Sequence, residues 1–162
     1  MQRADFAIVG GGIVGLSAAR ALQRASPKPR ALVVLEKDDE VCRHQSGRNS
    51  GVIHSGLYYR PGSLKARLAV AGARRMRRFC ERHDIPLKIC GKVVVATTPE
   101  EVPRLEALHS RAVANGVPNV ERVGPTRLQE LQPGVVGREG LWVPGSAITD
   151  FAAVGRRLAE LV

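Results

Sequence analysis

The alternation of apolar and polar positions predicts a strand, a helix and a second strand near the start of the chain. Residues 5–9, "DFAIV", form a short apolar run that ends at a glycine, as a buried parallel strand does. The next segment carries a helical apolar stripe that includes Ala18 and Leu22, and Pro27 closes it. Residues 31–37, "ALVVLEK", are a second β-branched run that ends with charged residues. This order predicts a right-handed βαβ unit.

Further along, the pattern predicts a long amphipathic helix and another strand. Apolar residues recur at spacings of about three and four, which predicts an amphipathic helix. Its expected apolar side comprises Leu64, Leu68, Ala71, Met76, Phe79 and Cys80. Residues 88–98, "KICGKVVVATT", are typical of a single strand.

The helix after this strand begins with a capping box. Thr98 is the N-cap residue, Pro99 takes the first helical position, and Glu101 stands three residues beyond the cap. The helix is expected to end near Asn115 and Gly116. Two short strands are expected at residues 120–123 and 140–143, with a small helix between them at 126–132. A last helix, capped by Asp150, is expected at residues 151–162.

Together these elements predict an α/β fold with an incomplete Rossmann-like βαβ unit and part of a second, α+β lobe. A doubly wound sheet needs more parallel strands than the two that flank the glycine-rich turn. We expect a first domain at residues 1–84, a second lobe at 85–148, and a helix returning toward the first domain at 149–162. The sequence ends inside this last amphipathic pattern, so we expect a fragment that needs a complementary C-terminal chain.

The basic composition narrows the class of protein. The chain has 162 residues, of which 44% are hydrophobic, and a formal net charge of +10. The densest basic run, residues 73–84, lies on the predicted long helix, where a solvated arginine face is the simpler interpretation. Aromatic residues make up only 4% of the chain and leave little for base stacking, so no nucleic-acid partner is expected. A non-catalytic basic module and a peripheral contact with an anionic membrane stay open as alternatives.

The cysteines indicate neither a metal site nor a disulfide framework. Cys42, Cys80 and Cys90 have spacings that match no metal clip, and we expect reduced thiols in a cytoplasmic protein. No run approaches the roughly 20 apolar residues of a membrane span. No targeting segment is visible.

The glycine turn after the first strand carries the strongest chemical signal. Gly10, Gly12 and Gly15 satisfy the pattern GxGxxG between a predicted strand and a predicted helix. The first glycine permits a tight turn, the second lets the backbone approach a pyrophosphate, and the third allows close packing of helix on strand. The alternative is a glycine turn that packs tightly and binds no ligand. The position of this motif between a predicted strand and a predicted helix favours a dinucleotide-binding site instead.

An acid at the end of the second strand refines this prediction. Glu36 lies about 20 residues beyond Gly15, where a carboxylate accepts hydrogen bonds from ribose hydroxyls and repels a 2′-phosphate. This argues against NADP. It does not separate NAD from FAD, because both carry an adenosine diphosphate.

Four stretches together resemble the N-terminal part of the L-2-hydroxyglutarate oxidase/dehydrogenase family. These are FAD enzymes of the D-amino-acid-oxidase-like group. The stretches are "DFAIVGGGIVGLSAARAL", "VVLEK", "SGRNSGVIHSGLYYRPGSLKA" and "GKVVVAT", and "GLWVPGSAITDF" is similar to a segment of the substrate lobe. The resemblance implies that residues 1–84 belong to the FAD-binding domain and residues 85–148 to the substrate lobe.

The resemblance also implies roles for single residues. The ADP part of FAD would be held by the glycine turn and Glu36. The pyrophosphate and flavin side would be lined by a second group, Ser46, Arg48, Asn49, Ser50 and Gly51. His54 would lie near the flavin and substrate, either as the base that takes the hydroxyl proton or as a residue that shapes the flavin pocket.

Candidate contacts to the substrate carboxylates are fewer. Tyr58 and Tyr59 could offer hydroxyls to a carboxylate, and Arg60 and Lys65 could neutralise a dicarboxylate, although ordinary packing and surface charge explain all four as well.

The activity implied is oxidation of a 2-hydroxy acid, L-2-hydroxyglutarate above all, to the 2-oxo acid by hydride transfer to flavin. Oxygen or a membrane quinone would accept the electrons, which allows a location at the inner membrane periphery. A sibling FAD enzyme acting on an amine or on glycerol 3-phosphate is the alternative. We expect little turnover from this chain alone.

Overall fold

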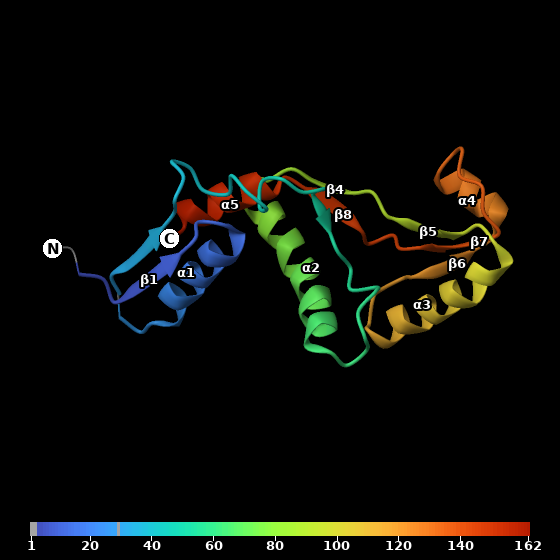
Figure 1. Cartoon of the computed structure of the whole chain (residues 1–162), viewed down its shortest axis with the longest axis horizontal. Coiled ribbons are helices and arrows are strands. Elements are labelled where there is room, and N and C mark those ends of the chain that lie inside the picture. Colours follow the sequence, from blue (N-terminus) through green and yellow to red (C-terminus); the bar gives the residue numbers. More distant parts are fainter. Residues whose placement is uncertain (1–2, 29) are drawn as a thin grey trace. The chain divides into compact units, whose positions relative to one another are not determined.

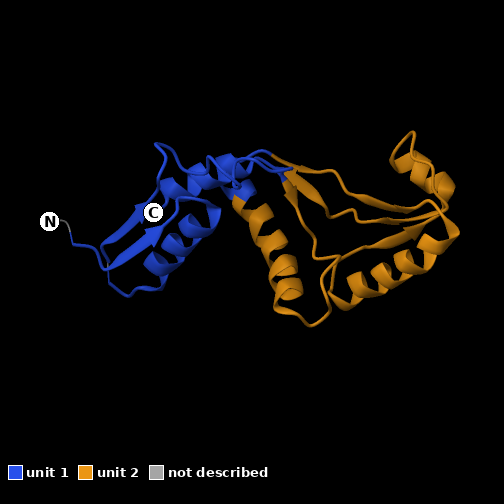
Figure 2. Ribbon diagram, viewed as in Figure 1, with its two compact units in different colours: residues 1–51, 80–86, 149–162 blue, residues 52–79, 87–148 orange. Residues whose placement is uncertain are grey.

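The computed structural model describes residues 3–28 and 30–162, and they form two compact units (Figure 1, Figure 2). Unit 1 comprises residues 1–51, 80–86 and 149–162, and unit 2 comprises residues 52–79 and 87–148. The chain therefore divides at different points from the predicted lobes, because residues 52–79 group with 87–148.

Unit 1 contains the predicted strand, helix and strand. Strand β1 (Phe6–Val9) pairs in parallel with β2 (Leu32–Leu35), and helix α1 (Ile13–Ala25) connects them. Leu16 and Ala19 form the buried side of α1. Parallel strands need such a crossover because the end of the first strand and the start of the second lie at opposite ends of the sheet.

Helix α5 (Phe151–Glu160) packs against α1 within unit 1. It buries Val154 and Leu158, and Asp150 caps it as predicted. The Asp150 Oδ1 atom accepts hydrogen bonds from the N–H groups of Ala152 and Ala153, at 2.8 and 3.0 Å. This cap satisfies two donors that have no partner within the helix.

Unit 2 contains two three-stranded sheets. The first has the order β3 (Val52–Ile53), β8 (Ala147–Thr149) and β4 (Leu87–Ile89). The second is antiparallel, with β7 (Glu139–Trp142) between β5 (Val93–Ala96) and β6 (Glu121–Val123).

Three α-helices accompany these sheets, and one of them builds the core of unit 2. They are α2 (Leu64–Arg82), α3 (Val102–Ala114) and α4 (Pro125–Leu131). Helix α3 follows a 3₁₀ turn at Pro99–Glu101 and packs on β5 and β7. The core lies beneath α3, with Leu57, Ala96, Leu105, Ala112, Val117, Leu141 and Val143 as its members.

The predicted capping box and helix end are both present at α3. Glu101 Oε2 accepts hydrogen bonds from the N–H groups of Thr97 and Thr98, at 2.7 and 3.3 Å. Gly116 follows the last turn with φ = +69°, a conformation that glycine adopts without a steric penalty.

The prediction of one strand over residues 88–98 is wrong. Gly91 has φ = +70° and divides the segment into β4 and β5, which belong to different sheets. A Cβ atom at Gly91 would lie 1.7 Å from the Trp142 ring, so only glycine fits there. A pattern of apolar residues cannot reveal this contact, because Trp142 comes from a distant strand.

The expected buried side of the long helix is also wrong in part. Leu64 and Leu68 are 65% and 61% exposed and Ala71 is also exposed, whereas Met76 and Phe79 are half-buried and Cys80 is buried as expected. Ala66 and Ala73, which were not expected on the buried side, are buried as well. Tertiary contacts therefore bury a different stripe in the first half of the helix.

Candidate functional site

The glycine turn brings the end of β1 against the start of α1. Gly10 has φ = +105°, and its N–H donates to the carbonyl of Leu35, at 2.7 Å. A Cβ atom at Gly15 would lie 2.0 Å from the carbonyl oxygen of Gly10. The helix therefore approaches the strand at a distance that only glycine permits, and the N-terminus of α1 faces the turn.

Glu36, directly after β2, forms a hydrogen bond with this turn. Its Oε2 atom accepts the N–H of Gly11 at 2.7 Å, and its Oε1 atom accepts the N–H of Lys37 at 2.8 Å. These backbone hydrogen bonds lower the pKa of the Glu36 carboxyl from its ordinary value, and the bond from Gly11 has the largest effect. Glu36 is thus a carboxylate with remaining acceptor capacity at the carboxyl end of a strand.

Ser46, in the loop after β2, forms a hydrogen bond at the start of α1. Its Oγ atom accepts the N–H of Ile13, the first residue of α1, at 3.0 Å. A Cβ atom at Gly12 would lie 3.2 Å from that oxygen. Within the described part of the chain, the Gly12 N–H makes no hydrogen bond. The helix N-terminus therefore keeps a free donor beside a hydroxyl.

The other residues expected on the cofactor side lie further along the loop. Asn49 donates from Nδ2 to the carbonyls of Gln45 and Ser46, and its Oδ1 atom accepts the N–H of Gly51. Gly51 has φ = +70° and pairs with Thr149. Asn49 and Gly51 thus shape the loop, while Arg48 and Ser50 are exposed.

Cys42 supports the turn and escaped the sequence analysis as a site residue. Its N–H donates to the Gly11 carbonyl at 3.2 Å, and its Sγ atom packs against Gly155. Burial raises the pKa of the thiol. No spacing signal could have revealed this role, because it depends on where α5 packs.

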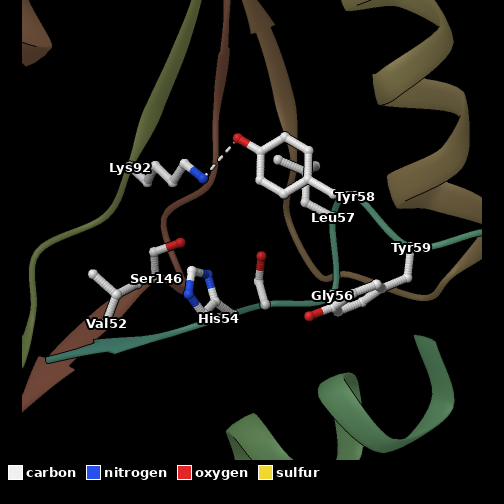
Figure 3. A pocket seen from close by; sticks show the side chains of 9 residues that line it. Val52, His54, Gly56, Leu57, Tyr58, Tyr59, Lys92 and Ser146 are labelled. Atoms are coloured by element: carbon white, nitrogen blue, oxygen red, sulfur yellow. Dashed lines mark hydrogen bonds between the residues drawn. The ribbon is translucent and has the colours of Figure 1, made fainter. Parts of the chain in front are cut away.

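A second candidate site is a cavity of about 120 Å³ within unit 2 (Figure 3). Its lining includes His54, Tyr58, Tyr59 and the polar residues Lys92 and Ser146, together with Val52 and Leu57. Figure 3 shows side chains from three separate stretches of chain, around residues 52–59, at Lys92 and at Ser146, grouped around it.

Lys92 and Tyr58 form the polar centre of this cavity. The Lys92 Nζ atom donates to the Tyr58 hydroxyl at 2.8 Å, and it lies 4.4 Å from the centroid of the Tyr58 ring. His54 belongs to the same lining and is exposed. The structure therefore brings His54, Tyr58 and Tyr59 together in the lining of one cavity. Sequence reasoning missed Lys92 and Ser146, which are distant from them along the chain.

Other candidates lie outside the cavity. Arg60 and Lys65 are exposed, and His44 pairs with Asp38 at 2.6 Å. Among residues 3–28 and 30–162, no group of three or more His, Cys, Asp or Glu side chains is arranged to hold a metal ion. In the same described ranges, no helix is long and apolar enough to cross a membrane.

The βαβ unit, its glycine turn and the acid after β2 define a dinucleotide-binding α/β protein. The family model of DAO, the FAD-dependent oxidoreductases, matches residues 5–162. The chain therefore belongs to the DAO family of FAD-dependent oxidoreductases.

Two curated relatives of this chain are L-2-hydroxyglutarate dehydrogenases. The mitochondrial L-2-hydroxyglutarate dehydrogenase of Caenorhabditis elegans is 45% identical over 160 residues, which cover 99% of this chain and 37% of that protein. The human mitochondrial enzyme of the same name is 43% identical over 156 residues, which cover 96% of this chain and 34% of that protein. The chain thus spans about a third of the length of these relatives.

A solved structure has the same fold. The L-α-glycerophosphate oxidase of Mycoplasma pneumoniae, with FAD bound, superposes with a TM-score of 0.87 at 26% identity. The match covers 99% of this chain and 42% of that one.

Proposed function

We propose that this chain forms part of an FAD-dependent enzyme that oxidises L-2-hydroxyglutarate to 2-oxoglutarate. The observation that carries the proposal is the glycine turn, where the N-terminus of α1, Ser46 and Glu36 meet. The identity of 43–45% to L-2-hydroxyglutarate dehydrogenases supports the substrate.

The donors and acceptors of the turn suit the ADP part of FAD. The unpaired Gly12 N–H and the positive end of the α1 dipole offer a place for a pyrophosphate oxygen. Glu36 keeps lone pairs for the ribose hydroxyls while Gly11 and Lys37 fix its orientation. The absence of a side chain at Gly12 leaves room for the backbone to approach the phosphate.

FAD, when bound, supplies the acceptor for the hydride that leaves carbon 2 of the substrate. In the proposed reaction, a ring nitrogen of His54 takes the hydroxyl proton at the same carbon. A histidine suits this task because its ordinary pKa lies near neutrality. The position of His54 in a polar cavity, next to Tyr58 and Lys92, supports the assignment. Oxygen or a quinone is the proposed electron acceptor.

A sibling activity on glycerol 3-phosphate or an amine is the second candidate. It is favoured by the structural likeness to the glycerophosphate oxidase. The sequence identity to that enzyme is 26%, against 45% to the Caenorhabditis elegans dehydrogenase, so we rank it below the hydroxy acid. The names of the two dehydrogenases include a mitochondrial location, and a cytoplasmic location for this chain stays a prediction.

The test uses the enzyme of which this chain forms part, and it begins with FAD binding, followed by anaerobic addition of substrates. Flavin bands that bleach with L-2-hydroxyglutarate, and not with its D enantiomer, glycerol 3-phosphate or glycine, are the expected result. Bleaching by glycerol 3-phosphate alone would establish the sibling activity. The variant Glu36→Ala should weaken FAD binding, while Glu81→Ala, an exposed acid on α2, should not.

The role of His54 has its own comparison. His54→Ala should lower kcat about 10²- to 10⁴-fold, the usual effect of losing a general base. His44→Ala serves as the matched control, since His44 is an exposed histidine paired with Asp38. A normal kcat in His54→Ala, with an altered flavin spectrum, would instead identify His54 as a residue that shapes the flavin pocket.

A further inference from the structure

We propose that Lys92, Tyr58 and Ser146 form the subsite that binds a carboxylate of the substrate. This inference rests on the proposed function for the identity of the acid. The site itself is argued from the cavity of unit 2, which is about 120 Å³ and thus well above the ~10–15 Å³ that one water needs.

The first argument is the uncompensated charge of Lys92. Within the described residues its ammonium group contacts the neutral Tyr58, through a solvent-exposed hydrogen bond to the hydroxyl at 2.8 Å and over the ring at 4.4 Å. No aspartate or glutamate lines the cavity. In the described part of the chain, Lys92 forms no ion pair. A cation beside an open cavity that has no counter-charge attracts an anion by Coulomb interaction.

The second argument is the unpaired hydroxyl of Ser146. Ser146 is 4% exposed as a residue, and within residues 3–28 and 30–162 its Oγ atom makes no hydrogen bond, but that oxygen is not among the fully buried side-chain atoms without a partner. Figure 3 shows the Ser146 oxygen pointing toward the space between Lys92 and His54. The Ser146 hydroxyl is therefore open to the cavity, where it can donate a hydrogen bond to a ligand.

The third argument is that the backbone fixes these groups before any ligand binds. Lys92 pairs with Val143 through both backbone groups, at 2.9 and 3.2 Å. The Ser146 carbonyl accepts the N–H of Gly91 at 2.9 Å, and its own N–H donates to Val143 at 3.2 Å. The backbones of Lys92 and Ser146 are thus held in one hydrogen-bond network next to Gly91, a position that only glycine can occupy. Such preorganisation lowers the entropy cost of binding.

The donor set suits a carboxylate better than a phosphate. Because Lys92 donates to the Tyr58 oxygen, the Tyr58 O–H proton is available to a second acceptor, as is the Ser146 O–H proton. One ammonium and two neutral hydroxyls match a single negative charge with several lone pairs. Phosphate sites more often use guanidinium forks or several cations, and the cavity lining contains no arginine.

The kinetic test uses the FAD-loaded enzyme and three variants. Lys92→Met should raise KM for L-2-hydroxyglutarate about 10- to 100-fold with a smaller change in kcat, because a charge-assisted contact to the substrate is lost. Lys92→Arg should restore part of the affinity. Lys88→Met, an exposed lysine on β4, is the matched control and should leave KM unchanged. Unchanged KM in Lys92→Met would overturn the proposal.

A second readout does not depend on turnover. Acetylation of lysines, mapped by mass spectrometry, should be slowed at Lys92 by glutarate, a dicarboxylate without a hydroxyl group, and unaffected at Lys88. Protection by inorganic phosphate with none by glutarate would overturn the carboxylate assignment. Protection by glutarate without flavin reduction by L-2-hydroxyglutarate would sink the proposed function while the carboxylate subsite stands. Unchanged Trp142 fluorescence would show that Lys92→Met is folded.

Discussion

The Glu36 Oε2 atom accepts a hydrogen bond from the backbone N–H of Gly11, with an N–O distance of 2.7 Å, although the two residues are 25 positions apart in the sequence. This hydrogen bond ties the end of β2 to the glycine turn that follows β1. Together with the bond from Ile13 to Ser46, it fixes the turn through two side chains. The proposed dinucleotide site is thus preorganised by these two hydrogen bonds before any cofactor binds.

Acidification should weaken the fold through Glu36. Backbone hydrogen bonds lower the pKa of its carboxyl from the ordinary value of 4.5, so the folded state favours the ionised form. This contribution to stability is present above about pH 4.5 and is lost as the pH falls through the lower folded-state pKa. The free energy of unfolding of Glu36→Gln should therefore approach that of the original chain as the pH falls below 4.5. A constant difference between the two at every pH would contradict this linkage.

Replacement of Gly15 should destabilise the βαβ unit. A Cβ atom there would lie 2.0 Å from the Gly10 carbonyl oxygen, so helix and strand must separate. We expect Gly15→Ala to cost about 1–3 kcal/mol in the free energy of unfolding, measured in urea. Gly72→Ala is the control, because Gly72 lies within α2 with nothing within 4 Å of its added Cβ. That variant should be neutral or more stable, by up to about 1 kcal/mol.

Replacement of Gly91 should disturb the cavity as well as the fold. Its φ of +70° alone costs about 1–3 kcal/mol for a residue with a side chain, and the added Cβ would also collide with Trp142. Trp142 is the single tryptophan of the chain, so its emission reports the collision directly.

The matched control for this variant is Gly134→Ala. Gly134 has φ = +87° and nothing within 4 Å of an added Cβ atom. It should lose stability through backbone strain and keep the emission of Trp142. Equal emission spectra for both variants would show that the ring does not depend on Gly91.

Cys90 and Cys42 should differ in their rate of alkylation. Cys90 is exposed, whereas Cys42 is 5% exposed and burial raises the pKa of its thiol. Since the thiolate is the reactive form, iodoacetamide at pH 8 should alkylate Cys90 at least about tenfold faster than Cys42. Mass spectrometry of the native protein measures both rates, and denaturation in urea should equalise them. Fast labelling of Cys42 in the native protein would mean that the turn is open to solvent.

Local sequence signals were sufficient where neighbouring residues decide the structure. The glycine turn and the caps at Glu101 and Asp150 depend on contacts that glycine, carboxylate and amide groups make at short, fixed offsets. The strands, the helix and the acid at Glu36 were recognised from the pattern of residue types along the chain, although the Glu36 contact itself is long-range. The resemblance to FAD enzymes rested on the same stretches, and family membership is confirmed. The roles of Ser46, His54 and the two tyrosines stay predictions.

Tertiary structure decided what depends on residues far apart in the chain. The break at Gly91 comes from the ring of Trp142, and the exposure of Leu64 and Leu68 comes from which side of α2 finds a partner. The meeting of Lys92 and Ser146 with Tyr58 depends on the backbone network around Val143. Sequence by itself determined the periodicity and turn chemistry, because these are local. Which apolar face is buried and which polar groups converge required the fold, because packing energy is summed over contacts between distant segments.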